Sequence, residues 1–224
     1  MRVTRVPAAN VLRKFMGDFP LVLLTATIWT YWFSVGAMVV RLRRKTRKLV
    51  GVVPELRVER LMWLVWVPLV AAWIVLPFLA LSRPAPPLGL PEFARGVPFY
   101  STLRWVAATV AVACLFATFN CWARMGKDWR MDVSVGNKTE LITDGLFRHL
   151  RHPIYAFSML LMICSVVIVP TVPLLAIALV HIVLMNLKAR NEERHLLAAH
   201  GEVYQRYLRQ TGRFLPRFDG GSPG

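Results

Sequence analysis

Four long stretches of the chain carry no Asp, Glu, Lys or Arg, and they alternate with short segments rich in arginine and lysine. The uncharged stretches are residues 19–40, 61–82, 105–123 and 154–187. About 20 apolar residues in a helix are enough to cross the ~30 Å hydrocarbon core of a bilayer. The pattern therefore predicts an all-α integral membrane protein that lies in a lipid bilayer.

The fourth stretch is too long for one crossing. As a straight helix, its 34 residues would extend about 50 Å, well beyond a ~30 Å core. Pro170 and Pro173 stand near its middle, and proline interrupts helices and favours turns. We therefore expect two helices joined by a tight turn, which makes about five membrane-spanning helices. The first helix of this hairpin has only about 16 residues, or roughly 24 Å.

The distribution of basic residues predicts the orientation. The segments after the first, third and fifth expected spans hold 21 of the 28 Lys and Arg, while the N-terminal segment and residues 83–104 hold 7. Short cytoplasmic loops are enriched in Lys and Arg. We therefore expect a multi-pass protein, in a cell (inner) membrane, with its N-terminus outside and its C-terminus in the cytoplasm. The proline-rich outer segment, residues 83–100, is expected to be irregular.

Composition supports one membrane domain. Hydrophobic residues make up 56% of the chain and the mean hydropathy is +0.47, which excludes a soluble domain of this length. A net charge of +16 would suit nucleic acid, but the basic residues lie in short loops between apolar segments, so we expect no nucleic-acid partner. We divide residues 1–224 into a three-span scaffold (1–123), a candidate cofactor-binding region that contains the predicted hairpin and the polar segments beside it (124–218), and a short tail (219–224). The oligomeric state is left open.

Two polar segments flank the predicted hairpin. Residues 145–157, GLFRHLRHPIYAF, place histidines and arginines at the edge of an apolar run, and residues 191–208 contain the acid pair Glu192 and Glu193. Lys188 and Glu192 are four residues apart, so they share one helix face. We expect that face to turn toward His152 and Tyr155.

The second polar segment has an apolar stripe at helical spacing that is broken near Gly201. We expect a pair of cytoplasmic helices there. The chain lacks a Walker-type phosphate loop, GxSxG, HExxH and an acidic cluster suited to a metal. Serine or zinc hydrolysis is therefore not expected, and neither is a bound metal.

The motifs ITDGLFRHLRHPIY, EExxL, GxxYxxY and RFLP, in this order, resemble the isoprenylcysteine carboxyl methyltransferase family and its relatives among the membrane phospholipid methyltransferases. The resemblance covers residues 124–218 and is carried mainly by RHPxY followed by EExxL. It implies an S-adenosylmethionine-dependent transferase. The cofactor would enter from the cytosol, and a lipophilic or small methyl acceptor would enter from the bilayer.

The resemblance also implies roles for residues. The cofactor-binding positions would be Glu140, Leu141, Ile142, Phe147, Arg151, His152, Pro153, Ile154, Tyr155 and Glu192. A family arginine that handles the acceptor aligns nearest to Lys188, with Arg190 close by. A carboxylate acceptor would need only orientation by Lys188 or Arg190, whereas an amine or thiol would need a base, for which Glu193 and His152 are the candidates.

Two other functions are consistent with parts of the pattern. Membrane sterol and steroid reductases, which use NADPH, share a related RHPxY motif, although they tend to have asparagine and an acid where this chain has Ile154 and Ser158. A non-catalytic membrane scaffold would need none of these residues as ligands. His152 would then cap the following helix, and Lys188 and Glu192 would form a surface ion pair. Two departures from the family pattern, Phe157 and Gly212 in place of glycine and proline, leave the acceptor open.

Overall fold

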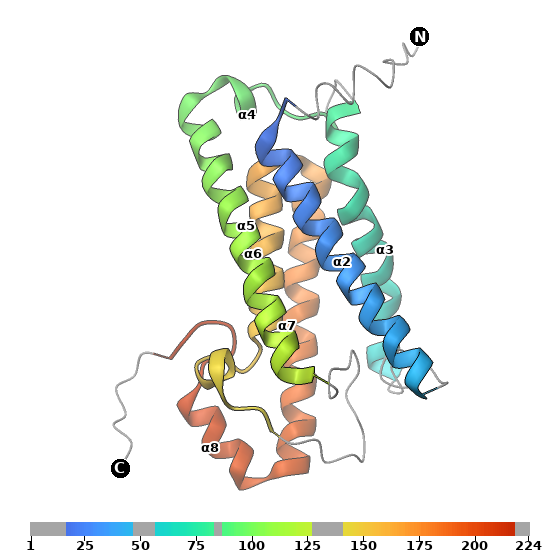
Figure 1. The fold of residues 1–224 in the computed structure, drawn as a ribbon, viewed down its shortest axis with the longest axis vertical. Helices are drawn as coiled ribbons and strands as arrows, with labels where there is room; N and C mark the ends of the chain where they lie inside the picture. Colours follow the sequence, from blue (N-terminus) through green and yellow to red (C-terminus); the bar gives the residue numbers. More distant parts are fainter. Residues whose placement is uncertain (1–16, 47–56, 83–86, 127–140, 218–224) are drawn as a thin grey trace.

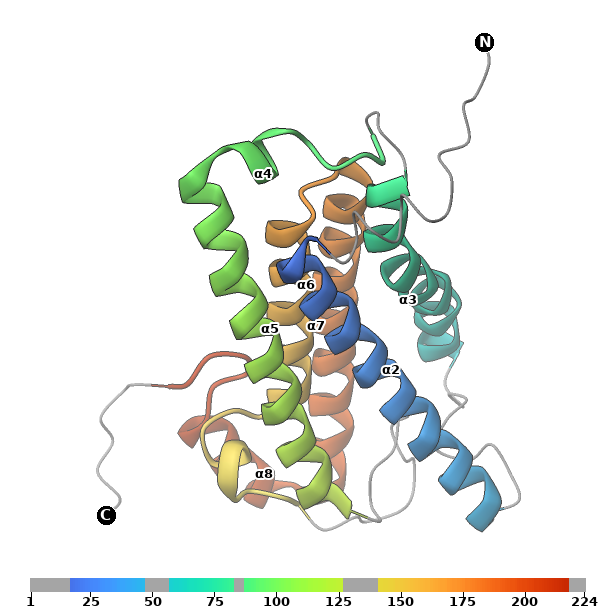
Figure 2. The same ribbon diagram turned by 45° about the horizontal axis from the view of Figure 1, so that its top comes forward.

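The computed structural model describes residues 17–46, 57–82, 87–126 and 141–217, and these residues form a helical bundle (Figure 1). The long helices are α2 (Phe19–Thr46), α3 (Arg57–Ser82), α5 (Pro98–Met125), α6 (Pro153–Ile168) and α7 (Val172–His200). The short helices are α4 (Phe93–Gly96), η2 (Gly145–Arg148) and α8 (Glu202–Gln210). Helix α4 lies at one end of the bundle, and η2 and α8 lie at the other (Figures 1 and 2). We call these the α4 end and the α8 end. Within the described ranges no named strand occurs, so the all-α prediction is confirmed there.

Four of the described helices, α2, α3, α5 and α7, are long and apolar enough to cross a membrane. Helix α6 is apolar too, but with 16 residues it reaches only about 24 Å. The outward faces expose large apolar side chains, among them Phe33, Phe116 and Leu179. Such surfaces are stable in contact with lipid rather than water. The chain is an integral membrane protein.

The proline hairpin is confirmed. Helix α6 ends at Ile168, α7 begins at Val172, and Pro173 stands in the first turn of α7, where its missing N–H costs no hydrogen bond. The last carbonyls of α6 find donors on α5. The Tyr100 hydroxyl donates to the Val167 carbonyl (2.9 Å) and Arg104 Nε donates to the Ile168 carbonyl (2.9 Å). Two of the carbonyls at the end of this short helix therefore have hydrogen-bond donors from α5.

A buried ion pair closes the α4 end. Arg104 Nη2 donates to both carboxylate oxygens of Asp18, at 2.9 and 3.0 Å, and Arg95 Nε lies 3.1 Å from the same carboxylate. The prediction that residues 83–100 are irregular is wrong for α4 and for the first turn of α5. The uncharged stretch that predicts the third span begins only after Arg104, because a charge usually ends a span. Here Asp18 neutralises that charge, so helix α5 begins earlier, at Pro98.

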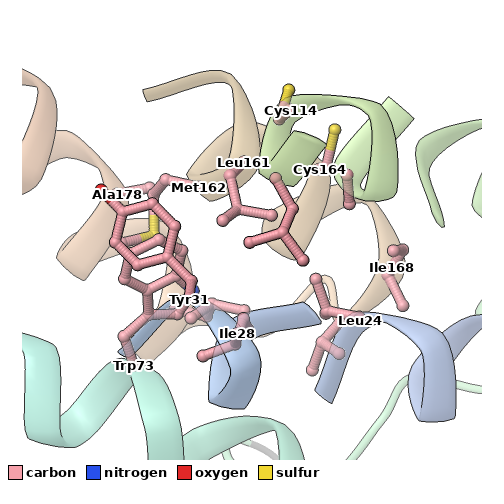
Figure 3. Packing of buried hydrophobic residues seen from close by; sticks show 14 of the residues in the cluster. Leu24, Ile28, Tyr31, Trp73, Cys114, Leu161, Met162, Cys164, Ile168 and Ala178 are labelled. Carbon is pink, nitrogen blue, oxygen red and sulfur yellow. The ribbon is translucent and has the colours of Figure 1, made fainter. Parts of the chain in front are cut away.

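Helix α6 lies between α5 and α7, and α2 and α3 cover the other side (Figures 1 and 2). Figure 3 shows the packed side chains, which come from all five long helices. Two hydrogen bonds cross this core. Trp73 Nε1 donates to Ser165 Oγ (3.0 Å), and the imidazole of His181 lies 3.0 Å from Ser158 Oγ. Both bonds end on α6, so they fix how that helix sits against α3 and α7.

Two helices continue past the uncharged stretches. Helix α2 runs to Thr46 and α7 runs to His200. Arginine, lysine and glutamate are good helix formers, so the hydrogen-bonded backbone does not stop where the apolar side chains stop. The predicted break is confirmed at Gly201, whose φ of 54° ends α7 and turns the chain into α8. The extension of α7 carries Glu192 and Glu193 beyond the apolar part of the bundle.

Candidate functional site

The first residues of α6 set the position of two aromatic rings. Pro153 is the first helical residue, and His152 before it is non-helical (φ −126°, ψ 61°) because the residue preceding a proline avoids the α region. The rings of His152 and Tyr155 lie parallel, with centroids 5.5 Å apart and 5° between their planes. The two rings are therefore stacked and form an aromatic surface at the α8 end.

Helix α7 brings two adjacent carboxylates to this surface. The Tyr155 hydroxyl donates a short hydrogen bond to Glu192 Oε1. The imidazole of His152 lies between the two acids, with Nδ1 3.4 Å from Glu192 Oε2 and Nε2 3.4 Å from Glu193 Oε1. The predicted face of α7 therefore does meet the start of α6.

The charges around His152 favour its protonated form. Burial lowers the pKa of the imidazole, which is only 7% exposed, but the carboxylates of Glu192 and Glu193 outweigh burial and raise the pKa above its ordinary value. His152 Nε2 is buried and makes no hydrogen bond within the described residues. In its protonated form the imidazole attracts both carboxylates, each at 3.4 Å.

Glu193 is bound by two arginines as well. Arg151 Nε donates to Oε1 (2.9 Å), and the Arg213 guanidinium donates to both oxygens, with Nη2 2.5 Å from Oε2. Arg151 also donates to the carbonyls of Leu208 and Thr211 at the end of α8. Glu193 is buried, whereas the side chain of Glu192 is 21% exposed. The two neighbouring acids thus have different surroundings.

Residues after α8 return to the site. Leu150 and Gly212 form an isolated parallel bridge, in which the Arg151 N–H donates to the Gly212 carbonyl (2.8 Å) and the Gly212 N–H donates to the His149 carbonyl (3.2 Å). The His152 N–H donates to the Arg213 carbonyl (3.2 Å). The ring of Phe214 lies 6.2 Å from that of His152. The C-terminal segment, residues 212–214, is therefore in direct contact with the RHPIY motif.

The remaining predicted residues lie nearby or outside the described ranges. Leu141, Ile142, Phe147 and Ile154 are half-buried, and Pro153 is buried at the start of α6. Lys188 acts electrostatically on Glu192, whereas Arg190 is exposed. Glu140 lies outside the described residues.

A comparison with models of known protein families finds a match for the region that contains these motifs. Residues 105–198 match the model of the isoprenylcysteine carboxyl methyltransferase (ICMT) family. This match confirms the resemblance carried by RHPxY and EExxL. The matched region contains most of α5, then η2, α6 and nearly all of α7.

A curated relative overlaps half of the chain. The nickel-cobalt-cadmium resistance protein NccN of Alcaligenes xylosoxydans xylosoxydans is 30% identical over 115 residues, which is 50% of this chain and 53% of that protein. The chain thus spans about half the length of the curated relative it matches.

The ICMT-family region ends before α8, whereas residues of α8 and of the segment after it also contribute to the site. Tyr207 of α8 donates to the Phe147 carbonyl (2.6 Å), and Arg213 binds Glu193. Sequence reasoning gave neither residue a role, although both stand in the quoted motifs GxxYxxY and RFLP. Helical spacing does not relate Arg213, in the segment after α8, to Glu193 of α7, so no pattern in the sequence indicated this pair.

Proposed function

We propose that this protein is an S-adenosylmethionine-dependent methyltransferase that acts at the cytoplasmic face of the membrane on a lipophilic or small acceptor. The observation that carries this proposal is the contact of Tyr155, Glu192 and His152 within the ICMT-family region. These residues lie where the apolar part of the bundle ends. A water-soluble cofactor and a membrane-borne acceptor can meet at such a boundary.

The chemistry of the residues fits this cofactor. Glu192 has the acceptor capacity of a carboxylate and uses part of it on Tyr155, so it remains able to bind a ribose hydroxyl or an ammonium group. The aromatic faces of Tyr155 and Phe147 suit a cation such as a sulfonium. The half-buried Leu141 and Ile142 supply apolar contacts for an adenine ring. When bound, S-adenosylmethionine supplies an activated methyl group on sulfur.

Methyl transfer is a direct displacement, so the protein does not need to form a covalent intermediate. Alignment of donor and acceptor and exclusion of water account for most of the acceleration that such a site provides. Arg151 and Arg213 are engaged by Glu193, and the family resemblance implies Lys188 or Arg190 as the residue that orients an acceptor. A carboxylate acceptor would use them directly, whereas an amine or thiol would also need to lose a proton.

The cytoplasmic placement rests on charge. Exposed arginines gather at the α8 end, including Arg190, Arg194, Arg206, Arg209 and Arg217. Basic residues next to membrane spans favour the cytoplasmic side, so we place the α8 end and the C-terminus there and the N-terminus outside.

Calorimetry on the detergent-purified protein tests the proposal. S-adenosylmethionine should bind with a one-to-one stoichiometry, and NADPH should not. Transfer of a labelled methyl group to a panel of prenylcysteine, phospholipid, amine and thiol acceptors would then identify the substrate. Binding of NADPH in place of S-adenosylmethionine would support a reductase, and binding of neither would support a scaffold.

A further inference from the structure

We infer that the C-terminal segment, residues 212–214, is a working part of the cofactor site, and that Glu193 is a positioning residue that joins this segment to His152 rather than a base. This inference rests on the proposed function. It concerns residues beyond the ICMT-family region, which ends at residue 198.

The first argument is the coordination of Glu193. Four N–H···O contacts from Arg151 and Arg213 occupy its two oxygens, at 2.5 to 3.1 Å. A general base must give up such partners and accept a proton at a pH near neutral. Two guanidinium groups instead stabilise the charged carboxylate. Glu193 is therefore suited to hold cations in place.

The second argument concerns the segment that Arg213 attaches to Glu193. Arg213 belongs to the segment whose carbonyls accept the backbone N–H groups of Arg151 and His152. The imidazole of His152 lies between the ring of Tyr155, at 5.5 Å, and that of Phe214, at 6.2 Å. If Arg213 leaves Glu193, the segment loses its ionic attachment, and both the backbone and the ring contacts of His152 are weakened.

The third argument is the geometry of the turn that follows α8. A Cβ on Gly212 would lie 1.7 Å from the Leu215 carbonyl oxygen, so only glycine allows the chain to fold back this tightly. That turn directs Arg213 toward Glu193 and Phe214 toward His152. The backbone is thus shaped so that the segment covers the site.

The charged groups around His152 provide a test that distinguishes a positioning role of Glu193 from a general effect on the stability of the fold. From α7 these are Glu192, Glu193 and, behind Glu192, Lys188. Arg213 of the C-terminal segment and Arg151 before α6 both bind Glu193, and the hydroxyl of Tyr155 comes from α6. Glu193→Gln removes an anion beside His152. Arg213→Gln removes one of the two cations that compensate this anion. The two variants should therefore change the proton affinity of His152 in opposite directions.

The experiment measures the affinity for S-adenosylmethionine as a function of pH for the full-length protein in detergent. Both variants should weaken binding on the order of tenfold, because each breaks a buried charge pair. In the plot of affinity against pH, the transition caused by titration of His152 should move to lower pH by about one pH unit in Glu193→Gln. In Arg213→Gln the same transition should move to higher pH. Arg213→Lys keeps the positive charge, so the transition should stay at its wild-type pH, while part of the affinity should be lost because lysine cannot make the same paired hydrogen bonds. Arg206→Gln, at an exposed arginine of α8, is the matched control and should behave as wild type.

A second measurement needs no cofactor. The backbone N–H groups of Arg151 and His152 should exchange with deuterium faster in Arg213→Gln and Glu193→Gln than in Arg206→Gln. Failure of the wild type to bind S-adenosylmethionine would overturn the proposed function, and the exchange rates would still decide whether the segment is held as we infer. Unchanged affinity and exchange in both variants would overturn the inference. Parallel losses of affinity without opposite pH shifts would reduce Glu193 to a structural role.

Discussion

Tyr155 of α6 donates its hydroxyl to Glu192 of α7, so a hydrogen bond joins the two arms of the proline hairpin at the α8 end. The two residues are 37 positions apart and belong to the two motifs that carry the family resemblance. The hairpin brings them together because each arm is a straight helix and the turn between them is short. The contact places the candidate site where the membrane bundle meets its polar end.

Two tyrosines of α8 should respond differently to loss of the hydroxyl. Burial raises the pKa of Tyr207 to about 12, so its hydroxyl stays protonated and donates to the Phe147 carbonyl. Tyr207→Phe should destabilise the fold by about 1 kcal/mol. The Tyr204 hydroxyl is buried without a hydrogen-bond partner among the described residues, so Tyr204→Phe should be neutral or stabilising. Unfolding in mixed detergent micelles measures both, and equal losses would contradict the assignment.

The tight turn at Gly212 should not tolerate a methyl group. Gly212→Ala would place a carbon against the Leu215 carbonyl, so the backbone must shift and residues 212–214 should leave the site. Gly36 has nothing within 4 Å of a built Cβ, and Gly36→Ala in helix α2 should be neutral or stabilising by up to ~1 kcal/mol. Affinity for S-adenosylmethionine should fall in the first variant alone. Equal affinity in both would show that the turn is not needed.

Stability should depend on pH through His152. Its pKa is raised in the folded protein, where burial opposes protonation but Glu192 and Glu193 favour it more strongly. The stabilisation is fully present below the ordinary histidine pKa of about 6.5 and is lost as pH rises through the raised value. The thermal midpoint should therefore fall as the pH rises above about 6.5 and through the raised pKa of His152.

The same series in His152→Gln should show a flatter pH profile. His149→Gln is the matched control, because the side chain of His149 is exposed. A steep profile that survives in His152→Gln would assign the titration to another group.

The ion pair at the α4 end should be costly to break. Arg104→Met leaves the half-exposed Arg95 as the ionic partner of the buried Asp18 carboxylate among the described residues, and leaves the Ile168 carbonyl without its donor. The expected loss is ~3–5 kcal/mol. Adding Asp18→Asn should recover part of it, since the unpaired charge is removed. Thr102→Ala, at an exposed position of α5, is the control, and a loss in Arg104→Met no larger than in this control would contradict the role of the pair.

The sequence was sufficient for the bundle because the bilayer imposes a simple rule. Long uncharged stretches become helices, and two prolines in the longest one become a turn. The rule failed at Arg104, because it takes each charge as unpaired and Asp18 lies 86 residues away. Pairing of distant charges is decided by packing and is not visible in a local pattern.

The residues of the candidate site also fall into those that a local sequence pattern could place and those that it could not. Helical spacing placed Glu192 on a face that meets Tyr155 and His152, and the contacts are as expected. The same spacing could not assign Arg213, which lies in an irregular segment and reaches Glu193 through the turn at Gly212. Residues on one helix are related by a fixed geometry, whereas residues after a turn are not.

The most direct test of the central claim is the affinity of S-adenosylmethionine for the wild type, Tyr155→Phe, Glu192→Gln and the double variant, measured by calorimetry at one pH. Each single change removes a group that would bind or orient the cofactor, and a hydrogen bond to a charged group is worth ~1.5–3 kcal/mol, or about 10- to 100-fold in affinity. Because the two side chains are in contact, the double variant should lose less than the product of the two single losses. Wild-type affinity in both single variants, with the fold intact, would contradict the account.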